Sequence, residues 1–166
     1  MQQYVLPVGL AAFLVLAFAG CGKSSSEHAA EKAVESAMAA QGQKADVSIQ
    51  SDSMKITTQE GSMSFGEGTK IPDDWPSDVP VYKGMKLVTA FSSPEGGALQ
   101  GTTSDSAAKV ESFYKEQAAK NGWTEDASFR QGDMVSLIYK KEKRVLSMIA
   151  TSADSETSIA ISLSNE

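Results

Sequence analysis

The sequence predicts an α+β protein in which two short helices pack against antiparallel strands. Apolar residues recur at helical spacing over residues 27–41 and 105–120, and they alternate with polar residues in most of the remaining segments. Short turns separate the alternating segments, which is typical of hairpins. We therefore divide the chain into a signal peptide (1–20), a tether (21–26), a helix-plus-meander subdomain (27–68), a proline-rich connector (69–84) and a helix-on-sheet domain (85–166).

The composition narrows the function classes. The 166 residues carry a net charge of −6, so the chain has no electrostatic drive to bind nucleic acid. It contains one cysteine and one histidine, so an internal disulfide is excluded and a zinc site of the usual Cys/His kind is not expected. We expect no metal and no cofactor.

The first twenty residues read as an export signal. An uncharged apolar run extends from about Tyr4 to Ala19, close to the length of a secretory signal core. Ala19 and Gly20 then precede Cys21. A peptidase must bind the chain in an extended form at the cleavage point, so small side chains are required there.

The sequence around Cys21 resembles the lipobox of bacterial lipoproteins. The resemblance implies cleavage after Gly20, a diacylglyceryl thioether on Cys21 and a further acyl chain on the new amino terminus, which together give stable anchoring. Phe18 stands where the family usually has Leu, so an uncleaved membrane helix is the alternative. Both interpretations place the remainder outside the cytoplasm, on a membrane facing the periplasm or at the cell surface. Gly22 favours the outer membrane if the source is Gram-negative.

A helix and a three-stranded meander are expected in residues 27–68. Ser26 is a candidate N-cap, and Gly42 is placed to end the helix. Its narrow apolar stripe is expected to cover the apolar face of the meander, since a small sheet alone is marginally stable. The alternating residues of the three strands are Val47 and Ile49, Met54 and Ile56, and Met63 and Phe65.

Residues 71–84 read IPDDWPSDVPVYKG and form the connector. Prolines at 72, 76 and 80 exclude a regular helix. Trp75 and Tyr82 are expected to pin this extended segment to a neighbouring surface. The alternative is that they form an aromatic platform facing a ligand.

The last part has the clearest pattern. Strands are expected at 86–92 and 98–103, followed by a helix that starts at Ser104 or Asp105 and ends before Asn121-Gly122. Three more strands are expected near 134–141, 145–152 and 157–164. Phe113 and Trp123 are the predicted main core residues, because large aromatic side chains bury the most area.

The motif IPDDWPSDVPVYKGMKLV, followed by VESFYKEQAAKNGW, is similar to a group of small bacterial lipoproteins of unknown function. They share a "DVP-Y" connector and a helix that ends in "FY…GW". The similarity covers most of the chain after the anchor. It implies the same architecture and location, and it implies no activity.

No catalytic set is evident in the sequence. His28 is the only imidazole and lies beside the tether, which is a poor place to hold a catalytic base. Lys140, Lys141, Lys143 and Arg144 form one basic cluster at a predicted hairpin. Lys140, Lys141 and Arg144 are candidates for contact with lipid headgroups or an acidic partner, or they form a charged turn that discourages edge pairing.

These observations favour a lipid-anchored envelope protein without enzymatic activity that binds or scaffolds another protein. A small-ligand binder, with a groove near Trp75, Tyr82 and Trp123, is the alternative. An enzyme that works without His or Cys is the third hypothesis. The expected partners are the membrane, through the lipid, and an envelope protein or a small ligand.

Overall fold

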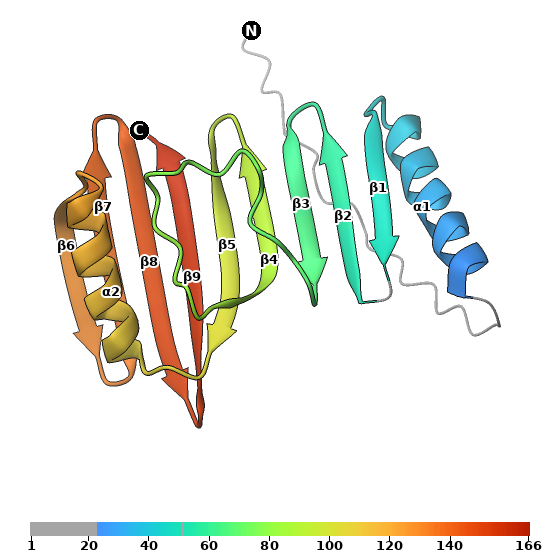
Figure 1. Ribbon diagram of the computed structural model, residues 1–166. Coiled ribbons are helices and arrows are strands. Elements are labelled where there is room, and N and C mark those ends of the chain that lie inside the picture. The colour runs from blue at the N-terminus through green and yellow to red at the C-terminus, as the bar shows by residue number, and fades with distance from the viewer. Residues whose placement is uncertain (1–22, 51) are drawn as a thin grey trace, which may run out of the picture.

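The computed structural model describes residues 23–50 and 52–166, which form two helices and nine strands. The predicted cleavage site at Gly20 and the lipidation site at Cys21 lie outside these residues. Figure 1 shows the elements in order. The helices are α1 (Lys23–Ala40) and α2 (Ala107–Lys120), and the strands are β1 (Ala45–Gln50), β2 (Ser53–Thr58), β3 (Gly61–Gly66), β4 (Lys86–Ser93), β5 (Gly96–Thr103), β6 (Thr124–Gln131), β7 (Met134–Lys141), β8 (Arg144–Ala153) and β9 (Glu156–Asn165).

All nine strands belong to one antiparallel sheet, in the order β1-β2-β3-β4-β5-β9-β8-β7-β6. The α+β class is confirmed, but the expectation of two separate sheets was wrong. Strand β3 pairs with β4 from Ser62↔Ser92 to Phe65↔Thr89, across the whole connector. A three-stranded meander leaves hydrogen-bonding groups free on both edges, and pairing with β4 satisfies one of them.

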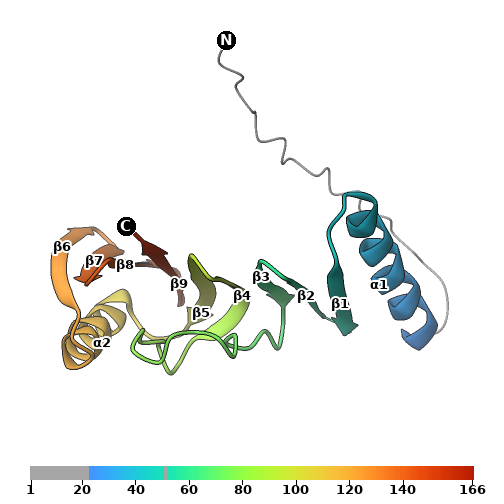
Figure 2. The ribbon, with the colours of Figure 1, turned by 90° about the horizontal axis from the view of Figure 1, so that it is seen from above.

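The connector and α2 cover the same face of the sheet, which we call the inner face (Figure 2). The core lies between them and strands β4, β5, β9, β8 and β7. Fully buried side chains such as Tyr114 of α2 and Leu137 and Met148 of the sheet fill it. Trp123 is also buried, as predicted, whereas Phe113 is only partly buried and packs against the core from its rim.

Helix α2 begins and ends with side-chain and glycine caps. Its N-cap is Ser106, one or two residues later than predicted, and the Ser106 hydroxyl accepts a hydrogen bond from the backbone N–H of Lys109. Asn121 and Gly122 end the helix as predicted, and Gly122 has a φ of 79°, which glycine adopts without steric cost. The buried residues of the helix are Ala107, Val110, Tyr114 and Ala118, which recur at helical spacing along one side.

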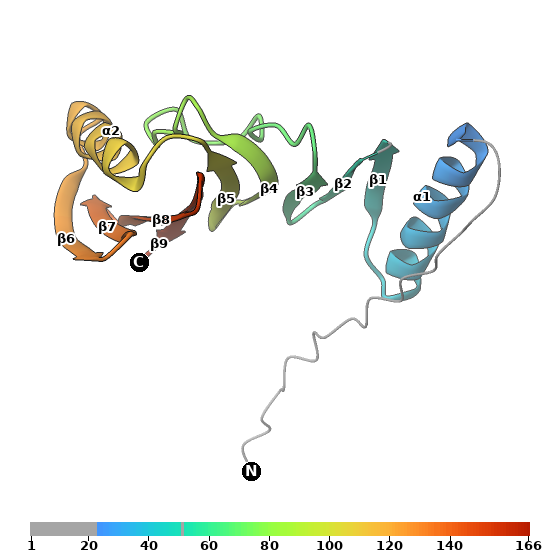
Figure 3. The same cartoon turned by 90° about the horizontal axis from the view of Figure 1, so that it is seen from below.

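Helix α1 lies along the outer edge of β1, as Figure 3 also shows. The backbone N–H of Ile49 donates to Glu31 at 2.8 Å, and that of Val47 donates to Glu35 at 3.3 Å. These N–H groups point away from β2 and need acceptors. The prediction that this helix covers the apolar face of the meander was wrong. The side of the helix that faces the sheet carries Glu31 and Glu35, whose carboxylates bind the backbone N–H groups at the edge of β1.

Two further boundaries differ from the prediction. Residues 23–26 form the first turn of α1 instead of a tether, so Ser26 is not its N-cap. Residues 23–41 contain no glycine or proline, so no residue in this segment stops the helix from beginning early. Strand β6 was not predicted. All eight of its residues are exposed, so its sequence lacks the alternation that marks a half-buried strand.

Within the part of the chain that the structure describes, neither helix combines the length and apolar character needed to cross a membrane.

Candidate functional site

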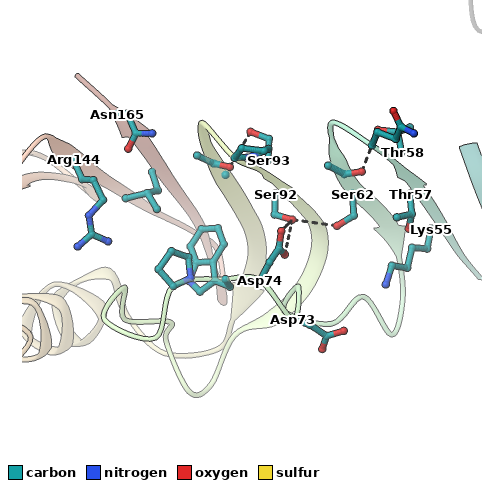
Figure 4. A pocket seen from close by; sticks show the side chains of 18 residues that line it. Lys55, Thr57, Thr58, Ser62, Asp73, Asp74, Ser92, Ser93, Arg144 and Asn165 are labelled. Carbon is teal, nitrogen blue, oxygen red and sulfur yellow. Dashed lines mark hydrogen bonds between the residues drawn. The ribbon is translucent and has the colours of Figure 1, made fainter. Parts of the chain in front are cut away.

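A groove of about 600 Å³ opens on the inner face, between the connector and the two hairpins β2–β3 and β4–β5 (Figure 4). We call it the inner groove. Its volume lies within the range of small-molecule sites. Most of the residues that line it are polar, and the labelled side chains come from the meander, the connector, β4, β8 and the end of β9. They include Lys55, Thr57, Ser62, Asp73, Asp74, Ser92, Arg144 and Asn165.

A chain of three hydrogen-bonded side chains forms the floor of the inner groove. The Ser92 hydroxyl donates to the Asp74 carboxylate, with distances of 2.7 and 2.9 Å to its two oxygens. The Ser62 hydroxyl lies 3.2 Å from the Ser92 oxygen. Ser92 is buried, and its proton is directed to Asp74, so the remaining hydrogen-bonding capacity of Asp74 and Ser62 is available to a ligand.

Trp75 forms one wall of the inner groove and is held there by the backbone of β5. A Cβ atom added to Gly97 would lie 2.8 Å from Cζ3 of the Trp75 ring and 2.7 Å from the carbonyl oxygen of Phe91. The indole N–H is directed to the carbonyl oxygen of Val79 at 3.4 Å. The ring therefore needs a glycine beneath it, and the connector fixes its orientation.

Arg144 closes the other end of the groove and is already paired. Its guanidinium makes two hydrogen bonds to Asp78, and Lys141 adds a third at 2.6 Å. The Arg144 guanidinium, with smaller help from Lys141, lowers the pKa of Asp78 to about 2. Both cations also lie near the Trp123 ring, with Arg144 5.0 Å and Lys141 6.0 Å from its centroid. This cluster fastens the connector to the β7–β8 hairpin.

The structure brings together only some of the predicted contact residues. Trp75 and Arg144 line the inner groove. Tyr82 is buried, and its hydroxyl donates to Asp105 at 2.6 Å; burial and this carboxylate raise its pKa to about 12. Lys141 belongs to the Asp78 cluster. Lys140 lies near Asp126 and Glu166, at 3.7 and 3.3 Å from their carboxylates.

The groove residues that sequence reasoning missed are Lys55, Ser62, Asp74 and Ser92. Consecutive members of this set lie 7 to 18 positions apart along the chain. They meet only because β3 pairs with β4 and the connector crosses both strands. Ser and Lys on the polar side of a strand give no signal by themselves. A buried serine opposite a serine of the next strand becomes visible only from the register.

Two of the three acidic residues of the connector bind different partners. Asp74 accepts from Ser92, whereas Asp78 binds Arg144 and Lys141. Over residues 23–50 and 52–166, no three His, Cys, Asp or Glu side chains gather in a way that could hold a metal ion.

A comparison with known families finds one match. A family model described as START domain-like matches residues 85–160, which is less than half of the 166-residue chain. The match covers β4, β5, α2, β6, β7, β8 and the start of β9, and so it includes the helix and the sheet that enclose the core. No curated protein and no solved structure matches the chain.

Proposed function

We propose that this chain is a lipid-anchored protein of the bacterial cell envelope that binds a small polar ligand in the inner groove and does not act as an enzyme. The groove carries the proposal. It combines an aromatic wall at Trp75 with hydrogen-bonding groups at Asp74 and Ser62, a combination that is typical of ligand sites.

The START domain-like match supports this choice over a purely structural role, because it is compatible with a ligand-binding fold. The space between α2 and the sheet is filled by the side chains of Val110, Tyr114, Leu137 and Met148, which are all fully buried. A ligand is therefore expected in the inner groove, outside this core.

The chemistry of the groove limits the ligand. Asp74 and Ser62 favour hydroxyl or amide donors. The carboxylate accepts hydrogen bonds, and Ser62, whose proton is directed to the Ser92 oxygen, also has lone pairs that can accept them. The Trp75 ring favours a flat apolar surface. A compact ligand with hydroxyl groups on one side and a carbon face on the other satisfies both.

Ser92 is poorly suited to nucleophilic catalysis. Its proton is directed to a carboxylate, whereas serine nucleophiles usually need a histidine or lysine base at hydrogen-bond distance. His28 lies on α1 and pairs with Glu31. These placements support a binding role.

The anchor is supported by Ala19-Gly20-Cys21 in the sequence. Helix α1 begins at Lys23, so two peptide steps separate it from the proposed lipid. Two residues span at most about 7 Å, so a lipid on Cys21 would hold the start of α1 at the bilayer surface. The folded part would then lie on the extracytoplasmic side of the membrane.

Ligand binding is tested by thermal unfolding of the purified chain against a panel of hydroxylated metabolites and sugars. A ligand of the inner groove should raise the Tm with a dependence on its concentration. The Trp75→Ala variant should lose that shift. Phe129→Ala removes an aromatic ring that is 55% exposed and far from the groove, and it should keep the shift. The ligand proposal fails if the hit stabilises Trp75→Ala as much as the parent.

The anchor is tested by metabolic labelling with a fatty acid. Cys21→Ala should abolish acyl incorporation and release the protein from the membrane fraction, whereas Ser24→Ala should change neither. Retained labelling in Cys21→Ala would show that Cys21 is not the lipidated residue.

A protein-binding scaffold is the second candidate function. It is favoured by a partly exposed apolar surface on the opposite face of the sheet, where Met63 is 36% exposed.

A further inference from the structure

The meander has an apolar face that points away from the connector and α2. We call the side of the sheet opposite to the inner face the outer face. Residues that share it follow from the strand register: Val47 pairs with Ile56, Ile56 with Met63, and Met63 with Phe91. The neighbouring residues Thr57, Ser62 and Ser92 lie on the inner face, because Ser92 bonds Asp74 of the connector. The apolar side of the meander is therefore the outer face.

This apolar face is only partly covered. Val47 is buried beside α1, but Met63 is 36% exposed, and Ile56, Phe65 and Phe91 are half-buried. Among the elements that the structure describes, helix α1 packs substantially against β1 alone. A sheet face of this composition normally packs against another layer.

A groove of about 650 Å³ lies on this face, between the tips of the β2–β3 and β4–β5 hairpins. We call it the outer groove. Its apolar floor consists of Ile56, Met63 and Phe91, and Glu60 and Glu95 stand at the two hairpin tips. No lysine or arginine lines it. Neither carboxylate forms an ion pair with any residue that the structure describes.

We propose that the outer groove binds a cationic amphipathic segment of a partner protein. The apolar residues of that segment would cover the floor, and its Lys or Arg side chains would reach Glu60 and Glu95. A helix laid in an apolar groove is a common recognition mode and fits a sheet face as α2 does on the other side.

The charges select this occupant over two others. A second copy of the chain would bring a second pair of carboxylates to the same rim, and like charges at an interface are unfavourable. An anionic bilayer surface would be repelled by the same carboxylates and by the net charge of −6. A basic amphipathic partner would bury apolar residues on the floor of the groove and pair its cations with the carboxylates at the rim.

The floors of the two grooves are on opposite faces of the sheet, and the two grooves share only residues at the hairpin tips, between 58 and 62 and at 93–94. The floor residues Ile56, Met63 and Phe91 and the rim residues Glu60 and Glu95 line the outer groove but not the inner groove. The inference therefore does not depend on the identity of that ligand or on the lipid. Trp75→Ala, which tests the inner groove, should leave binding at the outer groove unchanged.

The experiment titrates the full chain with two synthetic helical peptides and measures binding by calorimetry. One peptide contains Leu and Lys, with the leucines at i, i+3, i+4 spacing, and the other contains Glu in place of every Lys. The Leu/Lys peptide should bind with one site and weaken as salt is raised, because exposed charges are screened. The Leu/Glu peptide should bind at least ~10-fold more weakly.

Two variants locate the site. Met63→Ser removes an apolar side chain from the floor, and the double variant Glu60→Lys with Glu95→Lys reverses the charge of the rim. Each variant should bind the Leu/Lys peptide ~10-fold more weakly or worse. Their matched controls are Ile149→Ser, an outer-face residue that is 44% exposed on β8, and Glu156→Lys, an exposed acid at the start of β9. Both controls should bind as the parent does.

Three results would overturn the inference. The first is equal binding of both peptides, or equal loss in the variants and their controls. The second is a dimer in sedimentation velocity that Met63→Ser dissociates, which would assign the face to a second copy. The third is partitioning onto phosphatidylcholine vesicles that Met63→Ser reduces while peptide binding stays unchanged, which would assign it to lipid.

Discussion

The guanidinium of Arg144 holds the carboxylate of Asp78 with two hydrogen bonds, 3.0 Å from Nη1 to Oδ1 and 2.7 Å from Nη2 to Oδ2. The two residues are 66 positions apart, on the connector and at the start of β8. The paired geometry is the strong form of a carboxylate–arginine contact. It fixes the stretch of connector that follows Trp75, so the wall of the inner groove depends on it.

Asp78→Asn should lower the free energy of unfolding by about 1–2 kcal/mol at pH 7, since the pair is partly exposed. The pKa of Asp78 is about 2 in the folded chain, below its usual 3.8. A lowered carboxyl pKa stabilises the folded state above pH 3.8, and this contribution is lost as the pH falls towards 2. Urea unfolding at several pH values should show the parent approaching the variant below about pH 4. Asp73→Asn, at an exposed position of the same connector, is the control.

The edge of β1 should open when the carboxylates of α1 are removed. Glu31→Ala combined with Glu35→Ala deletes the acceptors of the Ile49 and Val47 amides, so these two amides should exchange hydrogen several-fold faster, without a matching change in β8. Lys32→Ala, exposed on the same helix, is the control.

The hydrogen bond between the Ile49 amide and the Glu31 carboxylate should weaken in acid. The backbone N–H of Ile49, with a smaller effect of His28, lowers the pKa of Glu31 from 4.5. The contact should therefore be complete above pH 4.5 and weaken as the pH falls through the lowered value. Exchange rates at these amides that do not depend on pH, after correction for intrinsic chemistry, would contradict this.

Gly97→Ala should destabilise the fold by about 1–3 kcal/mol, because its Cβ would overlap the Trp75 ring and the backbone of Phe91. The shift of the Trp75 ring should also change the tryptophan fluorescence and abolish ligand binding in the inner groove. Ala98→Ser, at the next position on the outer face, should be close to neutral. An unchanged Tm in Gly97→Ala would mean that the ring is not seated on this glycine.

Removing two tyrosine hydroxyls should have opposite effects. The Tyr139 hydroxyl is buried without a hydrogen-bond partner in the protein, and burial raises its pKa to about 12. Tyr139→Phe should therefore be neutral or stabilising by up to about 1 kcal/mol. Tyr82→Phe loses the 2.6 Å bond to Asp105 and should cost about 1–2 kcal/mol. Urea unfolding measures both, and a clear loss in Tyr139→Phe would indicate a bound water at its hydroxyl.

Much of the secondary structure could be predicted from local pattern. The helical stripe of Val110 and Tyr114, the Asn121-Gly122 stop and the alternation of Ile159, Ile161 and Leu163 all depend on neighbours within a few residues. Strand β6 was not predicted, because both of its sides are exposed and its sequence therefore lacks the alternation of apolar and polar residues. Ser106 was not predicted as the N-cap, because several adjacent polar residues are equally suitable.

By itself, the sequence determined the α+β class, most of the helix and strand positions, and the proline-punctuated connector, because propensity, period and turn chemistry act over short distances. Only the tertiary structure decided that the meander joins the same sheet, that α1 protects an edge instead of a face, and that Asp74, Ser92 and Ser62 meet in one groove. Those outcomes depend on which strand edge pairs with which. Backbone hydrogen bonds are the same for every residue type, so the choice is settled by the packing of the whole chain.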